Sequence, residues 1–438
     1  MDKNKLRCGI DLVGSFIHSL KKSGFSPAPL KTRQLATFSR SELGGLTIWD
    51  DEVLHYRNCI KTLAEAINNL SEVLSESAIE QAVQDTVLKS LDINQNFKDK
   101  NFDERLAESI KELGNRLTAS PGIWDVYFQV LGVRLKDSCF CFGKFRFLPA
   151  DKHTHKFLLQ QGYEIIQRSS DTDEAKEWSK KHLKKEIKKD LSEGVISWIK
   201  VEALDEKAAR SNAIEQLNLT LDILNFFTLI VHPRGMEVRA YLPGQAAYNT
   251  GTLSIACRQG AQFNAESGLR GPLDLFLLTD LDKSPPARRS LSLLSNILRL
   301  NKPNEFQKRL LASVRFAGRA TVNRVREESF LQHAIAMESL LSDKDGAGEI
   351  TFKLAARCAH LIGPDSQSRN DIFKEVKKLY GVRSKIVHRG NTDLTDMQLS
   401  RLQYYVRSSL FVILTQDMFD HIEDETKFLA WFDEKFFS

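Results

Sequence analysis

Arg383 and His388 are the two residues whose types and spacing best suit chemistry on a phosphate group. A histidine titrates close to neutral pH, so it can take up and return a proton under working conditions. An arginine stays charged, and its planar guanidinium matches two phosphate oxygens at once. Because an Arg-x4-His spacing also arises by chance, its context must decide whether the pair forms a site.

That context is a helix predicted over residues 370–389. Its apolar residues recur three and four positions apart, at Ile372, Val376, Leu379 and Ile386. Arg383 falls on the same stripe, where an arginine needs a charged partner. Glu338 is the candidate, because it shares a helix face with the apolar residues at 331, 334 and 335. The arginine therefore has a structural explanation, an ion pair, as well as a chemical one.

A bundle of helices must position these residues. Apolar periodicity and turn residues predict helices over 305–321, 327–341 and 352–362, in addition to 370–389. Gly390 suits the end of the 370–389 helix. Thr395 and Gln398 have the spacing of a capping box, so a further helix begins there. We expect the C-terminal region, residues 303–438, to be all-α.

Three segments of this bundle resemble the HEPN superfamily of ribonucleases, in particular its Apea-like branch. They are AMESLLS at 336–342, FKLAARCAHLIG at 352–363 and LYGVRSKIVHRG at 379–390. The Arg-x4-His motif of that family maps onto Arg383 and His388. Ser384 stands where many members have Asn, Asp or His. Gly390 stands where a subset has a tyrosine that a partner enzyme modifies, so the resemblance does not extend to that regulation.

The resemblance implies an endoribonuclease that needs no metal or cofactor. In such a reaction the 2′-OH of RNA attacks the neighbouring phosphorus, and the product carries a 2′,3′-cyclic phosphate. The implied catalytic residues are Arg383, His388 and Ser384, and the implied RNA-binding residues are Lys378, Lys385 and Arg389. Relatives of this kind act in bacterial anti-phage defence, abortive infection or toxin-type growth arrest. The N-terminal region would then respond to a phage-derived or host trigger.

The helix geometry also bears on the oligomeric state. Positions five apart on an ideal helix are separated by about 140°, so Arg383 and His388 do not share a face. The resembled family solves this by dimerisation, in which two copies of the motif meet across a two-fold axis. We therefore expect a homodimer formed through the C-terminal bundle.

The first 300 residues have a mixed pattern. Residues 1–45 are rich in Ser, Pro and basic side chains and predict a loosely ordered arm, and residues 46–120 have helical periodicity. Residues 121–300 predict an α+β domain with a sensing or regulatory role. Within it, alternating phenylalanines on either side of Gly143 predict a hairpin, and Asp205 is placed to cap a long helix. The expected fold class is an α+β N-terminal region followed by an all-α helical bundle.

A lysine-dense helix is predicted near residues 174–190. Its lysines are Lys176, Lys180, Lys181, Lys184, Lys185, Lys188 and Lys189. Such a helix is either a nucleic-acid face or, more commonly, a solvated surface. A DNA-binding regulator that uses this helix is the weakest functional hypothesis.

Composition excludes a disordered, fibrous or membrane-spanning protein. The 438 residues are 42% hydrophobic and 27% charged, and 62 Lys+Arg against 57 Asp+Glu give a net charge of +5. The longest apolar runs fall far short of the roughly 18 residues that a membrane span needs. Six scattered cysteines favour a reducing compartment. We expect a cytoplasmic protein without a membrane partner.

Cys139, Cys141, His153 and His155 are the best candidates for a zinc site. Each pair is separated by a single residue, whereas structural zinc sites usually have two to four intervening residues. We therefore expect no metal site. The main alternative to the nuclease is a non-catalytic RNA-binding or scaffold protein in which Arg383 and His388 are structural.

Overall fold

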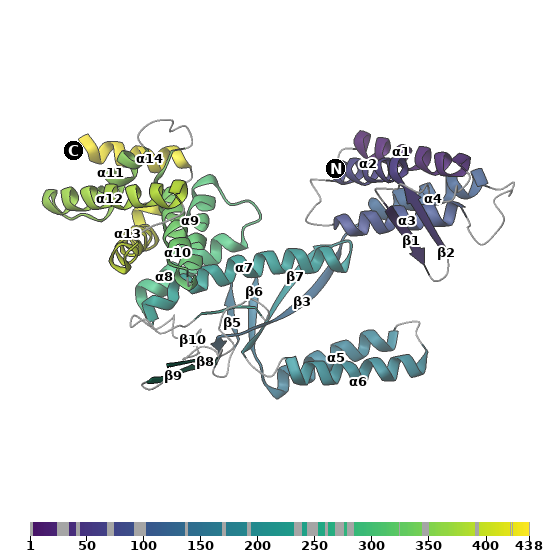
Figure 1. Ribbon diagram of the computed structural model, residues 1–438, viewed down its shortest axis with the longest axis horizontal. Helices are drawn as coiled ribbons and strands as arrows, with labels where there is room; N and C mark the ends of the chain where they lie inside the picture. The colour runs from purple at the N-terminus through teal and green to yellow at the C-terminus, as the bar shows by residue number, and fades with distance from the viewer. Residues whose placement is uncertain are drawn as a thin grey trace. The chain divides into compact units, whose positions relative to one another are not determined.

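The computed structural model describes most of the chain. The described residues are 3–23, 35–40, 44–67, 74–91, 102–135, 139–168, 172–190, 194–231, 239–242, 253–258, 262–267, 276–277, 284–323, 325–343, 350–389, 394–420, 422 and 424–437. They form two compact units, Met1–Val126 with Lys200–Glu215, and Tyr127–Ile199 with Gln216–Ser438. The structure is mostly helical, with a small antiparallel sheet in the N-terminal half and helices in the C-terminal half (Figure 1).

The first unit is built on four helices and a hairpin. The helices are α1 (Lys3–Ser23), α2 (Asp50–Ile67), α3 (Glu76–Leu91) and α4 (Phe102–Leu117), and strands β1 (Leu35–Arg40) and β2 (Gly44–Trp49) pair antiparallel. All four helices contribute to one apolar cluster, which includes Phe16, Leu63, Val83 and Leu113. Helices α2, α3 and α4 lie within the segment predicted to be helical, residues 46–120.

The prediction of a loosely ordered arm over residues 1–45 was wrong for residues 3–23, which form α1. Val13, Phe16 and Ile17 are fully buried in the cluster shared with α2 and α4. The helix is stable because its apolar stripe has partners far along the chain, and these are not visible in the local composition. In the run rich in Ser, Pro and basic residues that suggested an arm, at 23–41, residues 24–34 lie outside the described residues and residues 35–40 form strand β1, so the prediction was wrong there too.

The second unit contains most of a four-stranded sheet. Its strand order is β3 (Gly122–Val130), β7 (Val195–Ala203), β6 (Phe145–Pro149) and β5 (Phe140–Phe142). The predicted hairpin is confirmed, because Phe142 pairs with Phe145 and Gly143 has the positive φ of +57° that such a turn requires. Smaller strand pairs are formed by β4 (Val133–Arg134) with β10 (Phe276–Leu277), and by β8 (Leu253–Arg258) with β9 (Gln262–Ser267).

Two helical features adjoin the sheet in sequence. Helices α5 (Lys152–Arg168) and α6 (Asp173–Asp190) pack side by side as a hairpin (Figure 1). Helix α7 (Glu206–Val231) is capped as predicted, since Asp205 accepts a hydrogen bond from the Ala208 amide at 2.9 Å. The lysine-dense helix predicted near 174–190 is α6.

The C-terminal helices follow one another with short connections. They are α8 (Pro285–Arg299), α9 (Glu305–Val322), α10 (Arg326–Leu341), α11 (Ile350–Ile362), α12 (Ser366–Arg389), α13 (Asp396–Thr415) and α14 (Glu425–Phe437), with a 3₁₀ turn at Asp417–Phe419. They confirm the predicted helices between 305 and 389. The capping box of Thr395 and Gln398 is also present, with both reciprocal hydrogen bonds formed.

Close packing joins this bundle to the second half of α7. A Cβ atom on Gly318 of α9 would lie 1.7 Å from the carbonyl oxygen of Asp222 on α7, so only glycine fits there. The Asp222 carboxylate accepts hydrogen bonds from Arg319 at 2.7 Å and pairs with Arg315 at 3.4 Å. Among the described helices, none combines the length and the hydrophobicity that a bilayer crossing requires.

Candidate functional site

Helix α12 carries the candidate site and is firmly built. Asp365 begins it by accepting hydrogen bonds from the amide and the hydroxyl of Ser368, and these bonds lower the pKa of the carboxyl group. Val376 and Leu379 are buried on the face that meets the bundle. Tyr380 is buried beside them, and its hydroxyl donates to the carbonyl of Ala334 on α10 at 3.1 Å. The helix therefore has one fixed rotation relative to α10.

Arg383 is paired as the sequence suggested. Its Nε lies 3.3 Å from a carboxylate oxygen of Glu338 on α10, and the two side chains are 34% and 26% exposed. Burial raises the pKa of the Glu338 carboxyl, and the nearby guanidinium offsets only part of that rise. The ion pair accounts for the arginine on an otherwise apolar stripe.

His388 lies on a different side of the same helix. Each residue turns an α-helix by about 100°, so His388 is about 140° around α12 from Arg383. The His388 and Ser384 side chains are exposed, whereas the residues that flank Arg383 on its stripe are buried. Within one chain, α12 directs Arg383 toward α10 and His388 toward solvent, so the two do not meet.

The exposed face of α12 is positively charged. Lys374, Lys377, Lys378 and Lys385 are all exposed on this helix. Two of the three expected RNA-binding residues, Lys378 and Lys385, are therefore accessible to a polyanion. Arg389 is the last residue of α12, but its side chain and Gly390 lie outside the described residues.

Sequence reasoning missed a second polar network on α12. The hydroxyl of Tyr405 on α13 donates a hydrogen bond to Glu375, which also lies 3.4 Å from Nε of Arg401. Burial and the adjacent carboxylate raise the pKa of Tyr405. This network fixes α13 against α12, and no local spacing relates residue 375 to residues 401 and 405.

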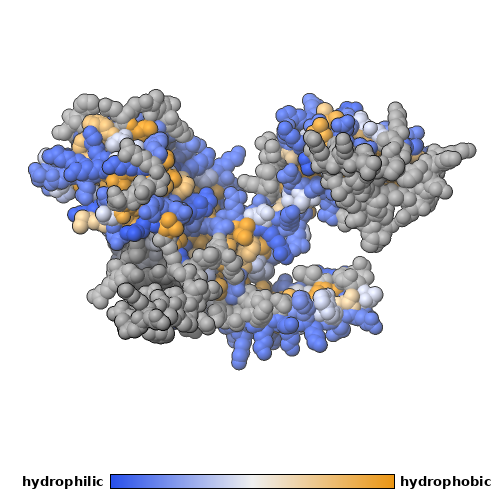
Figure 2. All heavy atoms as spheres, in the orientation of Figure 1, coloured by the Kyte–Doolittle hydropathy of each residue, from blue (hydrophilic) through white to orange (hydrophobic). Residues whose placement is uncertain are grey.

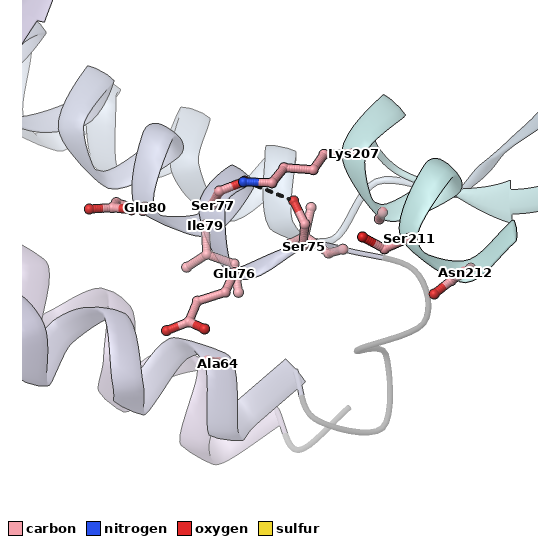
Figure 3. A pocket seen from close by; sticks show the side chains of 11 residues that line it. Ala64, Ser75, Glu76, Ser77, Ile79, Glu80, Lys207, Ser211 and Asn212 are labelled. Atoms are coloured by element: carbon pink, nitrogen blue, oxygen red, sulfur yellow. Dashed lines mark hydrogen bonds between the residues drawn. The ribbon is translucent and has the colours of Figure 1, made fainter. Parts of the chain in front are cut away.

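A cavity of about 530 Å³ lies in the first unit, between the end of α2, the start of α3 and the start of α7. Figure 3 shows Glu76 and Ser77 lining it from α3, with Ser211 and Asn212 on α7. Asp205 accepts hydrogen bonds from the amides of Ser75 and Ala208, so one carboxylate already occupies the starts of both helices. These are the donors that a bound anion would otherwise use.

The zinc candidates do not form a recognisable site. Cys139 and Cys141 are exposed near and on β5, and His153 and His155 lie in the first turn of α5. Within the described part of the chain, no three His, Cys, Asp or Glu side chains gather where they could hold a metal ion. The thiols of Cys8, Cys59, Cys139, Cys141 and Cys358 are free.

Comparison with known proteins identifies no family or function for this chain. No protein-family model matches the chain, and neither a curated protein nor a solved structure matches it.

Proposed function

We propose that the C-terminal helices form a metal-independent endoribonuclease, in which Arg383 and His388 of α12 act together with the same residues of a second copy. The N-terminal residues would restrain or trigger it, as in an effector of anti-phage defence or growth arrest. The observation that supports this most is the exposure of His388 beside the lysines of α12, on the helix that also holds Arg383 in place.

The chemistry needs a proton acceptor and a cation. His388 takes the proton of the 2′-OH as its oxygen attacks phosphorus, and the second copy's histidine returns a proton to the departing 5′-oxygen. Arg383 stabilises the charge that grows on the phosphate oxygens. The contact with Glu338 uses the Nε edge of the guanidinium, which leaves four further N–H groups for phosphate and also orients the plane.

Gly381 supports association of two copies through the side of α12 that carries His388. It lies about 20° around the helix from His388, and among the described residues no heavy atom would come within 4 Å of a Cβ placed there. A glycine inside a helix costs about 1 kcal/mol relative to alanine. A second helix that approaches closely would explain why the position is not alanine. Gly381→Leu should therefore weaken self-association, measured by sedimentation or light scattering. Gly114→Leu is not a suitable control for this variant, because a side chain at position 114 would contact Ile10 within the chain.

The direct test is RNA cleavage in EDTA by the wild type, Arg383→Ala and His388→Ala. Arg401→Ala removes an ion-paired arginine from the neighbouring helix and His153→Ala an exposed histidine from α5, so these are matched controls. The proposal expects cleavage by the wild type and both controls and its loss in the two α12 variants. Equal activity of wild type and His388→Ala would overturn it, and a fully active monomer would overturn the shared site.

The ion pair itself favours a second candidate function, a non-catalytic RNA-binding or scaffold protein. If Arg383 serves only to satisfy Glu338, its loss lowers stability and leaves any RNA binding unchanged. His388 would then be a helix-terminal residue favoured by the helix dipole. This alternative would be supported if the wild type binds RNA without cleaving it, and if Arg383→Ala is less stable than the wild type but binds RNA equally well.

A further inference from the structure

The outer face of α6 carries an exposed pair of stacked rings. Trp178 is 67% exposed. Its ring lies parallel to that of His182, with the centroids 5.1 Å apart and 5° between the planes. A tryptophan normally buries most of its large apolar surface, so one that is left largely in water points to a partner that covers it.

Lysines border these rings. At about 100° per residue, Lys185 and Lys181 lie about 20° and 60° from Trp178 around the helix, and Lys188 follows. All three are exposed. Helix α6 as a whole has seven lysines against five acidic residues. Lys180, the lysine that pairs with Glu177 at 2.9 Å, lies on the side nearer α5 and does not face the rings.

A shallow groove of about 740 Å³ lies between α5 and α6, and other lysines of α6 line it. Leu159 and Tyr163 of α5 give it an apolar floor, and Lys156, Lys180 and Lys184 line it together with Glu164. Figure 2 shows the hydrophilic edge that α6 gives to this hairpin. The lysines of α6 thus border two surfaces on which flat apolar groups can stack, Lys181 and Lys185 beside the rings and Lys180 and Lys184 in the groove.

We propose that the α5–α6 hairpin binds single-stranded RNA, with phosphates along the α6 lysines and bases stacked on Trp178–His182 and over Tyr163. Aromatic rings next to cations are the means by which proteins hold single strands without reading their sequence. In a duplex the faces of the bases are covered by their neighbours. Its phosphates could pair with the lysines, but its bases could not stack on the rings. The proposed occupant is therefore a single strand, and this inference does not depend on the proposed cleavage at α12.

The test is fluorescence anisotropy with a dye-labelled, fully 2′-O-methylated 20-nucleotide RNA, which 2′-OH attack cannot cut. Trp178→Ala should weaken binding roughly tenfold, and Trp178→Phe should retain most of it. Replacing Lys181, Lys185 and Lys188 with glutamine should reduce the salt dependence, by a slope of about 0.7 per phosphate contact. Tyr404→Ala and Lys308→Gln are matched controls, since both side chains are exposed on other helices.

Each of the following outcomes would contradict one part of the proposed RNA-binding surface. Equal binding by wild type and Trp178→Ala, with both folded by circular dichroism, would overturn the stacking surface. Equally tight binding of duplex RNA or of heparin would show a polyanion surface and overturn the single-strand assignment, whereas tighter binding of a DNA strand would overturn the choice of RNA. Loss of binding in His388→Ala alone, with Trp178→Ala unaffected, would place the RNA on α12 instead.

Discussion

Helices α6 and α12 are the two lysine-rich helices of the second unit, and they use their lysines in different settings. Among the described side chains of α6 only Ile187 is buried, so the helix is open to solvent over most of its circumference. In α12, Val376, Leu379, Tyr380 and Ile386 are buried and Arg383 is tied to Glu338. Lysine density therefore does not distinguish a helix that is open to solvent from one that is fixed in the bundle. The neighbours that fix or expose the other side chains do.

The largest expected difference between the two helices is catalytic. His388→Ala should lower the rate of RNA cleavage about 10²- to 10⁴-fold, the range expected when a general base is removed. Lys181→Gln on α6 should change the maximal rate less than threefold and act on the apparent affinity. Single-turnover cleavage at saturating protein measures both. A large fall in the maximal rate of Lys181→Gln would contradict the prediction that α6 affects only the affinity for RNA.

The buried side of the bundle has a pH dependence of its own. His333 on α10 is fully buried, its Nδ1 lies 2.9 Å from the Ser329 carbonyl, and burial lowers its pKa to about 4. Between pH 6.5 and 4 the unfolded chain binds a proton that the folded chain does not. Stability should therefore fall by roughly 3 kcal/mol as the pH falls through this window.

Urea unfolding at several pH values measures this fall. His333→Gln keeps a donor for the Ser329 carbonyl but does not titrate, so its stability should depend less on pH than that of the wild type. Identical pH profiles for the two proteins would contradict the assignment of the effect to His333.

The Arg383–Glu338 pair should contribute modestly to stability. Both side chains are partly exposed, so a double-mutant cycle with Arg383→Ala and Glu338→Ala should give a coupling of about 0.5–1 kcal/mol. If both single variants retain full stability yet Arg383→Ala loses cleavage, the arginine acts on substrate. A coupling above roughly 3 kcal/mol, with cleavage lost in both variants in proportion to unfolding, would mean that Arg383 supports the fold and does not act on substrate.

The smallest expected effect is on the stability of the α6 variants. Replacement of Lys181, Lys185 and Lys188 by glutamine should change the free energy of unfolding by less than about 0.5 kcal/mol, because exposed side chains contribute little. Calorimetry of the triple variant checks this. A pronounced loss of stability would mean that the lysines belong to the fold rather than to a binding surface.

Helix caps and tight turns could be predicted from the sequence, because they are formed by residues close together in the chain. The Thr395 capping box, the Asp205 cap and the hairpin at Gly143 all depend on residues a few positions apart, and the structure contains each of them. Glu338 was found as the partner of Arg383 because both stand on apolar stripes, where a charge requires a counterpart.

Other features depend on contacts that the local sequence does not contain. Helix α1 forms because α2 and α4 cover its stripe, and the Glu375–Tyr405 bond joins residues thirty positions apart. The exposure of Trp178 follows from how α6 packs on α5, since the same residue would be buried if the helix were rotated by half a turn. The assignment of catalysis to Arg383 and His388 stays a prediction.

The most direct test of the account is the chemistry of the cleaved ends. Wild-type protein incubated with RNA in EDTA should leave 2′,3′-cyclic phosphates, and a substrate with 2′-O-methyl groups throughout should stay intact while still binding. Cleavage of the methylated RNA, or cyclic ends of equal yield from His388→Ala, would contradict a reaction in which the RNA 2′-OH is the nucleophile and His388 its base.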